Sequence, residues 1–253
     1  MPADVNSVNE EIKNEARKVW QTKTGIERVK YFVYYYKWWV IGIAVVGLMV
    51  GSMVHDFATR KESVFQVMVV NGEYDEYYDY KSLIDEFAKT VEYDPKKEEV
   101  ILDSSAHVDI HAVDQMSQMT VQKIFLNVAA KELDVLICDK ELMELTCSQS
   151  CAYDLEEILS PELLEKYKDQ IYWFDMSTLP SDDITALDDP DAEKPELSEE
   201  ERYKALSIDV SDFYKIKETN MFPYNDGEAY AVIPVNTMQL ENAIAFLEYL
   251  DRP

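Results

Sequence analysis

The chain has 253 residues, with 24 Lys and Arg against 50 Asp and Glu, which gives a formal net charge of -26. A surface of this charge repels a polyanion such as DNA, so the composition argues against a nucleic-acid partner. The hydrophobic content of 47% and the aromatic content of 12% are ample for a packed core and argue against wholesale disorder. The composition therefore predicts a folded chain with an acidic surface.

Charge is distributed unevenly along the chain. Residues 1–37 carry seven basic and five acidic side chains, residues 38–54 carry none, and residues 55–253 carry 17 basic and 45 acidic side chains. Seventeen helical residues at about 1.5 Å each extend roughly 25 Å, a little less than a hydrocarbon core of about 30 Å. Trp38, Trp39 and the aromatic turn before them suit the headgroup region and make up the difference. We therefore expect a transmembrane helix at residues 38–54.

A cleavable signal peptide and a buried helix of a soluble fold are the alternatives for this segment. Thirty-seven residues precede the apolar run, and GSMVHDFA after it is a poor cleavage site. A buried amphipathic helix would carry a polar face, which residues 38–54 lack. The basic residues that flank the segment are Lys23, Arg28, Lys30 and Lys37 before it and Arg60 and Lys61 after it. The positive-inside rule then predicts a single-pass protein of the cell membrane with a cytoplasmic N-terminus and an extracellular C-terminal lobe.

These boundaries define the expected domains. Residues 1–37 form a cytoplasmic N-terminal arm, residues 55–63 a linker, and residues 64–253 an extracytoplasmic α/β lobe. The charged side chains of the arm alternate in sign, and the arm is too small to bury a core. We therefore expect a solvated, weakly helical tail, with a docking helix for a cytoplasmic partner as the alternative.

The first half of the lobe alternates strands with helices. Val64–Val70, Val100–Leu102 and Leu133–Ile137 are near-continuous apolar runs, and apolar residues at helical spacing follow each of them. Buried strands that alternate with helices are typical of a mostly parallel sheet flanked by helices on both faces. The predicted fold class is α/β.

The second half is less regular. We expect strands at Ile171–Phe174, Leu206–Val210 and Tyr230–Val235, and a last helix with Asn236 as its N-cap. The acidic segment at about 182–202 is interpreted as a solvated loop. A calcium site is its alternative, but the segment lacks the spacing of an EF-hand loop.

Two segments carry a resemblance to a known family. MTVQKIFLNVAAKELDVLICDKELMELTCSQSCAYDLEEILSPELLEKY resembles a part of bacterial extracellular solute-binding proteins, which have the type 2 periplasmic-binding-protein fold. GEAYAVIPVNTMQLENAIAFLEYL resembles a later part of the same lobe. Family members close two lobes on a ligand, whereas the stretch between Trp173 and Leu206 is too short and too polar to form a second lobe. The resemblance thus implies a short, single-lobe, membrane-anchored relative.

Ligands of open α/β sheets bind beyond the carboxyl ends of the strands. The candidate ligand-binding residues at these positions are Asn71, Gly72, Glu73, Ser104, Ser105, Asp139 and Lys140. Tyr230 is expected to add an aromatic wall. All of them are also ordinary residues of strand-to-helix turns.

We expect no enzymatic activity, no catalytic residues, no cofactor and no metal. Nucleophile-elbow and phosphate-binding motifs are absent from the sequence. His107, Asp109 and His111 would share one face of an extended strand, but such neighbours rarely converge on a zinc ion. Cys147 and Cys151 are four residues apart, and the sequence does not decide whether they form a disulfide.

Two functions follow. The first is a membrane-anchored solute-binding-like module that captures a small ligand or presents it to a transporter or sensor. The second is a non-enzymatic structural or accessory protein that holds other membrane proteins together.

Overall fold

The computed structural model describes residues 10, 13–14, 17–18, 24–59, 61–72, 80–112, 114–178, 198, 202–223 and 227–253. The chain divides into two compact units, Met1–Arg60 and Lys61–Pro253, each of which we describe by itself. The predicted acidic loop at 182–202 lies almost wholly outside the described residues.

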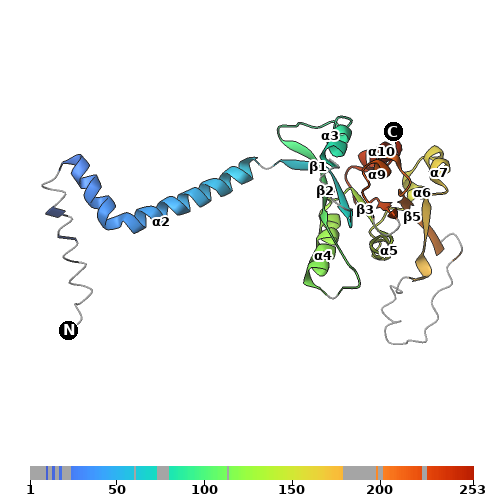
Figure 1. The fold of residues 1–253 in the computed structure, drawn as a ribbon, viewed down its shortest axis with the longest axis horizontal. Coiled ribbons are helices and arrows are strands. Elements are labelled where there is room, and N and C mark those ends of the chain that lie inside the picture. The colour runs from blue at the N-terminus through green and yellow to red at the C-terminus, as the bar shows by residue number, and fades with distance from the viewer. Residues whose placement is uncertain are drawn as a thin grey trace, which may run out of the picture. The chain divides into compact units, whose positions relative to one another are not determined.

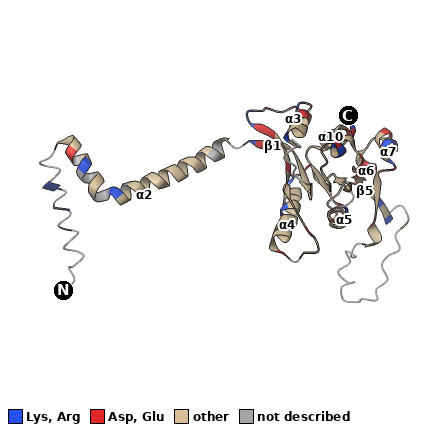
Figure 2. Ribbon diagram, in the orientation of Figure 1, with Lys and Arg blue, Asp and Glu red and all other residues tan. Residues whose placement is uncertain are grey.

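The first unit is dominated by helix α2, which runs without interruption over Gly25–Thr59 (Figure 1). Its segment Lys37–His55 is long and apolar enough to cross a membrane. All side chains of residues 41–55 are exposed, so none of them is buried by the part of the chain that the structure describes. Lys and Arg of α2 lie in its N-terminal part (Figure 2), residues 38–54 are uncharged, and Asp56 follows them near the end of the helix. Because α2 ends at Thr59 and the next strand begins at Glu62, most of the predicted linker 55–63 is helix or strand.

The second unit is built on one six-stranded sheet with the order β2-β1-β3-β6-β5-β4. The strands are β1 (Glu62–Val70), β2 (Glu98–Ala106), β3 (Val135–Cys138), β4 (Ile171–Asp175), β5 (Tyr203–Asp209) and β6 (Tyr230–Val232). β1 is parallel to β2 and β3, and the other three pairings are antiparallel. The prediction of an α/β fold is confirmed, but that of a mostly parallel sheet is wrong. Apolar runs report burial on both faces of a strand and carry no information on its direction.

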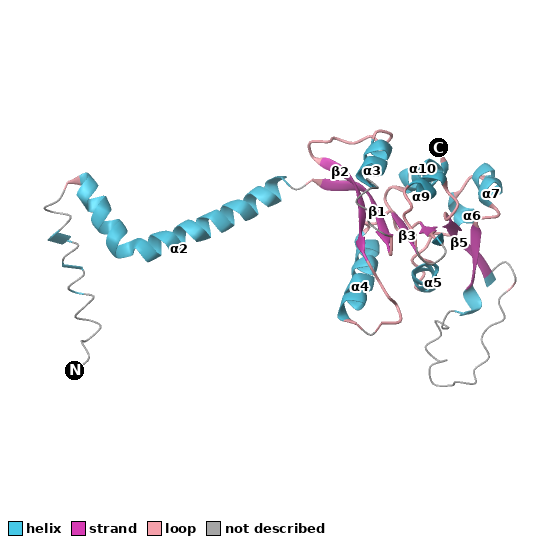
Figure 3. Cartoon of the chain, in the orientation of Figure 1, coloured by secondary structure: helices cyan, strands magenta, loops and turns pink. Residues whose placement is uncertain are grey.

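Helices cover both faces of the sheet (Figure 3). One face packs on α3 (Tyr80–Ala88), α6 (Leu155–Ile158), α7 (Pro161–Tyr167), α9 (Tyr214–Glu218) and α10 (Leu240–Asp251). The other face packs on α4 (Gln115–Ala130) and α5 (Lys140–Ser148). β1 contributes side chains to the hydrophobic cores on both faces of the sheet. Phe65, Val67 and Val69 pack in the core that contains α3 and α10, and Met68 and Val70 pack in the core that contains α4 and α5.

Three element boundaries differ from the predictions. β2 continues to Ala106 because its register with β1 extends through Met68↔Asp103 and Val70↔Ala106. α4 begins earlier than its apolar pattern indicates, since the Asp114 carboxylate accepts a hydrogen bond from Ser117 N and caps the helix. α10 begins only at Leu240, and Asn236 does not cap it; its Nδ2 donates to Val128 O at 2.6 Å.

The larger core contains a cluster of three buried phenylalanines from β1, α3 and α10. The ring centroid of Phe87 lies 4.9 Å from that of Phe246 and 5.3 Å from that of Phe65. Phe246 is fully buried, so its ring joins the last helix to the first strand.

Replacing Phe246 by alanine should lower the free energy of unfolding by about 3–5 kcal/mol, because the cavity adds to the lost burial. Urea unfolding of the full chain in mild detergent, followed by circular dichroism, measures the change. The control is Val235→Ala, at a half-exposed loop position, which should cost well under about 1 kcal/mol. Equal losses for the two variants would contradict the packing described for α10.

Candidate functional site

The parallel half of the sheet contains a topological switch point. The chain leaves β1 and returns first as β2 on one side of it and then as β3 on the other. In open sheets this arrangement opens a crevice beyond the carboxyl ends of the strands, here those of β1 and β3. The segments that follow these two strands begin with Asn71 and Asp139.

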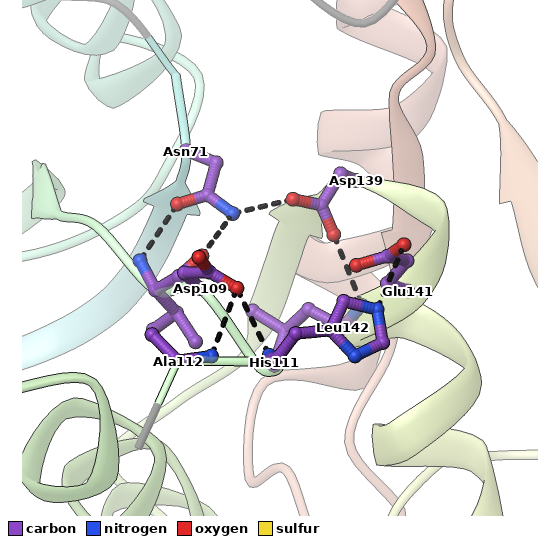
Figure 4. A network of polar contacts seen from close by, with 8 residues as sticks. Asn71, Asp109, His111, Ala112, Asp139, Glu141 and Leu142 are labelled. Atoms are coloured by element: carbon purple, nitrogen blue, oxygen red, sulfur yellow. Dashed lines mark hydrogen bonds and ion pairs between the residues drawn. The ribbon is translucent and has the colours of Figure 1, made fainter. Parts of the chain in front are cut away.

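Asn71 connects three segments at this edge (Figure 4). Its Oδ1 accepts a hydrogen bond from Val108 N at 2.7 Å, and its Nδ2 donates to Val108 O at 2.8 Å and to Asp139 Oδ2. The backbone of Asn71 has a φ of 61°, in the left-handed region that asparagine tolerates better than most residues. A turn and a side chain thus hold the loop after β2 against the start of α5.

Asp139 is the N-cap of α5. Its Oδ1 accepts from Leu142 N at 3.0 Å, while its Oδ2 accepts from Asn71. Both oxygens therefore have partners within the protein. Asn71 and Asp139 come together as the strand ends suggest, but they hold the edge in place and do not present unpaired groups to a ligand.

The other residues predicted at the ends of β1 and β2 have different surroundings. A Cβ on Gly72 would lie 2.6 Å from Val69 Cγ1 and 3.3 Å from Met221 O, so this position requires glycine for packing. Glu73 lies outside the described residues. Ser104 and Ser105 belong to β2 itself, not to a turn after it; Ser104 lines a groove between β2 and α3, and Ser105 donates its hydroxyl to Asp103.

Lys140 and Tyr230 meet through a residue that the sequence analysis assigned only to a strand. The ring of Tyr172 on β4 lies 5.7 Å from Lys140 Nζ and 5.7 Å from the ring of Tyr230. Tyr172 also donates its hydroxyl to Glu144 Oε1 at 2.6 Å. Burial, together with Asp209, raises the pKa of Tyr230 to about 12, so its hydroxyl stays neutral at physiological pH.

A pocket of about 320 Å³ lies beside the Asn71 network. It is lined by Asp109, Ile110, Ala112, Ser117, Gln118, Val121, Gln122 and Leu145. These residues come from the loop after β2, from the first turns of α4 and from α5. Because Val108 is bonded to Asn71 and precedes Asp109, the network fixes the loop that forms one wall of the pocket.

The loop wall is further ordered by its own hydrogen bonds. Asp109 Oδ1 accepts from His111 N at 2.9 Å and from Ala112 N at 3.1 Å, and Asp109 N donates to the buried Ser117 Oγ at 3.2 Å. At the rim, His111 Nε2 lies 3.3 Å from Glu141 Oε1. Among the residues that line the pocket, one is a carboxylate and none is Lys or Arg.

The sequence analysis missed Ser117, Gln118 and Gln122. The signal for them was the capping Asp114, which starts α4 at Gln115 and so places these three polar side chains in the first turns of the helix, where they line the pocket.

Metal and thiol chemistry have little geometric support in the described part of the chain. It contains no group of three or more His, Cys, Asp or Glu residues arranged to hold a metal ion. Cys138, Cys147 and Cys151 are free thiols. Burial raises the pKa of Cys147 to about 12, so this thiol is a packing residue and a poor nucleophile.

Comparisons of the chain with protein-family models, with curated proteins and with solved structures find no match. The resemblance to solute-binding proteins therefore stays a prediction, and the functional argument rests on the geometry of the pocket.

The Asn71 cross-link can be tested with two substitutions. Asn71→Gly removes the side-chain hydrogen bonds but keeps the backbone unstrained, and should lower the free energy of unfolding by about 1–3 kcal/mol. Asn71→Ala adds the cost of an alanine at positive φ, about 1 kcal/mol more. Urea unfolding of the full chain in mild detergent measures both. A glycine variant as stable as the wild type would show that the cross-link contributes nothing.

Proposed function

We propose that the protein is a membrane-anchored, extracytoplasmic solute-binding-like module that captures a small ligand and presents it to a transporter or another membrane protein. The observation that carries this proposal is the pocket lined by the Asp109 loop, α4 and α5, which lies beside the switch point of the sheet. Ligands of α/β proteins bind preferentially at such places.

The lining suits a compact organic molecule. A volume of about 320 Å³ is at the lower end of the range of ligand pockets, about 300–1,000 Å³. The aliphatic side chains of Ile110, Val121 and Leu145 offer an apolar wall, and the amides of Gln118 and Gln122 offer donors and acceptors. This combination would orient a ligand that has both a hydrocarbon part and polar groups.

Charge narrows the ligand class to neutral or cationic molecules. Among the described residues that line the pocket, Asp109 is the carboxylate and none is lysine or arginine, and the whole chain carries -26. An anionic ligand would be repelled at long range and would find no counter-charge in the pocket. Hydroxyl-rich and ammonium-bearing solutes fit this chemistry.

A single lobe would bind a ligand from one side only. The residues described from Lys61 onward form one sheet with its two helical layers, and the pocket is open to solvent on its outer side. Without a second lobe to close over it, a captured ligand keeps part of its surface in water, so binding is weak and release is fast. These are useful properties for a module that hands its ligand to a neighbour in the same membrane.

The proposed location follows from α2 and from charge. The segment Lys37–His55 is the proposed membrane anchor, preceded by the basic collar and followed by the acidic lobe. The bias of basic residues supports a cytoplasmic N-terminal arm and an extracellular lobe.

Thermal unfolding of the full chain in detergent micelles tests ligand capture, with lysine, glucose and succinate as a cationic, a neutral and an anionic probe. A ligand at ten times its Kd adds about 1.4 kcal/mol, which should raise the Tm by roughly 3–5 °C. We expect a shift with the cationic or the neutral class and none with succinate.

Substitutions of pocket residues test whether the shift in Tm comes from ligand binding in this pocket. Asp109→Asn should raise the dissociation constant of a cationic probe about tenfold, because the ligand loses a charged partner. Gln122→Leu should raise the dissociation constant of cationic and neutral probes severalfold, because the ligand loses a hydrogen-bonding partner. Gln115→Leu is the matched control, since Gln115 is exposed on the same helix and does not line the pocket. A shift that persists in the Asp109→Asn, Gln122→Leu double variant would place binding elsewhere, and no shift with any probe would refute ligand capture by this chemistry.

A further inference from the structure

Strand β2 forms one edge of the sheet, and its outer side is open in the part of the chain that the structure describes. β2 is last in the strand order, and β1 is its one partner among the described strands (Figure 1). It is nine residues long, whereas β4 at the opposite edge has five. Edge strands are commonly kept short or protected by lysine or proline, because an open edge attracts a further strand. β2 contains neither residue, so its sequence does nothing to prevent strand addition.

The register of β1 shows which backbone groups of β2 point outward. Gln66 N donates to Asp134 Oδ2 at 2.8 Å and Gln66 O accepts from Asp134 N at 3.0 Å, so Gln66 is directed to the β3 side. Its neighbour Val67 is therefore directed to β2, where its register partner is Leu102. In a parallel pair such a residue bonds to the two neighbours of its register partner. The N–H and C=O of Leu102 thus point away from β1, as do those of Val100 two residues earlier.

A groove of about 520 Å³ lies between this edge and α3. Val100 and Leu102 line it from β2, Ile84 and Ala88 line it from α3, and Tyr93 lines it from the loop that joins the two elements. Val100 and Leu102 pack, partly buried, against the core on the α3 side. The residues with outward backbone groups therefore direct their side chains to the same side of the sheet as the groove. A strand added to β2 would place alternate side chains between β2 and α3.

These features identify the occupant as an extended polypeptide. Outward N–H and C=O groups that recur at every second residue are matched by another strand, and a groove with aliphatic and aromatic walls accommodates its alternate side chains. A helix could not pair with this edge, because its own backbone groups are bonded within the helix.

The charges of the groove favour a basic segment. The lining contains the carboxylates of Asp85, Glu98 and Glu99 and the ammonium groups of Lys61 and Lys81. The side chains of Asp85 and Glu99 have no hydrogen-bond or ion-pair partner among the described residues. Lysine or arginine side chains of a bound segment would pair with them. Residues 55–253 carry 17 basic and 45 acidic side chains, so a basic segment is also attracted at long range and an acidic one is repelled.

We propose that β2 and α3 form a docking groove for a basic, extended segment of another protein, which adds a strand to the sheet beside β2. A second copy of this chain is a poor occupant, because β2 carries the carboxylates of Glu98, Glu99 and Asp103 and no lysine or arginine. The proposal does not rest on ligand capture, since the groove and the pocket beside the Asn71 network share no lining residue.

The first test uses a synthetic peptide of about seven residues that alternates lysine and valine, is capped at both ends and carries a fluorophore. Fluorescence anisotropy measures its binding to the full chain in nonionic detergent micelles. We expect saturable binding, a dissociation constant at least about tenfold higher when the peptide amides are N-methylated, and no binding when glutamate replaces lysine. N-methylation keeps the side chains and their charges, so equal binding of the methylated peptide would contradict strand addition. Absence of binding by the unmethylated lysine peptide would refute the proposal.

Substitutions at Val100 test whether the peptide binds at the edge of β2. Val100→Pro removes an outward N–H, which an edge strand tolerates, and should raise the dissociation constant of the lysine peptide at least about tenfold. Val100→Thr keeps the N–H and the β-branched shape and should bind within about twofold of the wild type. Circular dichroism checks that both variants are folded. A folded Val100→Pro variant with wild-type affinity would place binding elsewhere and overturn the proposal.

A double variant tests the charge of the groove without relying on the proline variant. Asp85→Asn with Glu99→Gln should raise the dissociation constant about fivefold and reduce its dependence on salt. The matched control is Glu157→Gln with Glu162→Gln, which removes two exposed carboxylates from α6 and α7 and should change binding less than about twofold. Equal effects of the two double variants would show that the acidic surface as a whole attracts the peptide, against the groove. A wild-type dimer in light scattering that Val100→Pro separates would assign β2 to a second copy and equally overturn the proposal.

Discussion

The side chain of Asn71 is the interaction on which the candidate site depends. One amide at the end of β1 binds both backbone groups of Val108 and the carboxylate that caps α5. It can do so because its backbone adopts a φ of 61°, which turns the chain sharply at the strand end. Without this cross-link, the polar contact described between the loop that carries Asp109 and helix α5 would be the exposed pair His111–Glu141, and the pocket between them would lose its fixed width.

Charge divides the lobe into surfaces with different roles. Most of the exterior is acidic, which keeps copies of the chain and anions apart. Two regions depart from this, the pocket with its amides and aliphatic wall and the outer side of α4 with its methionines. Gln118 and Gln122 of the pocket lie on the side of α4 next to Met119 and Leu126.

The sequence predicted what depends on local patterns and failed where distant segments meet. The apolar runs of β1 and β3 identified buried strands, and strand ends identified Asn71 and Asp139 as neighbours. The same runs could not reveal that β6 lies antiparallel to β3, because burial on both faces looks alike in either direction. Tyr172 was missed because the partner of its hydroxyl, Glu144, is 28 residues away. Ser117 was missed although its signal is local, since Asp114, which caps α4, is only three residues before it.

The proposed function requires that α2 spans a membrane and that the lobe with its pocket lies outside the cell. Labelling of intact cells with a membrane-impermeant maleimide tests it directly, with single cysteines at Ala245 in the lobe and at Lys13 in the N-terminal arm, in a Cys151→Ser background that removes the half-buried thiol. The account predicts that the cysteine at position 245 is labelled in intact cells and the one at position 13 only after lysis. Labelling of position 13 but not of position 245 in intact cells would contradict it.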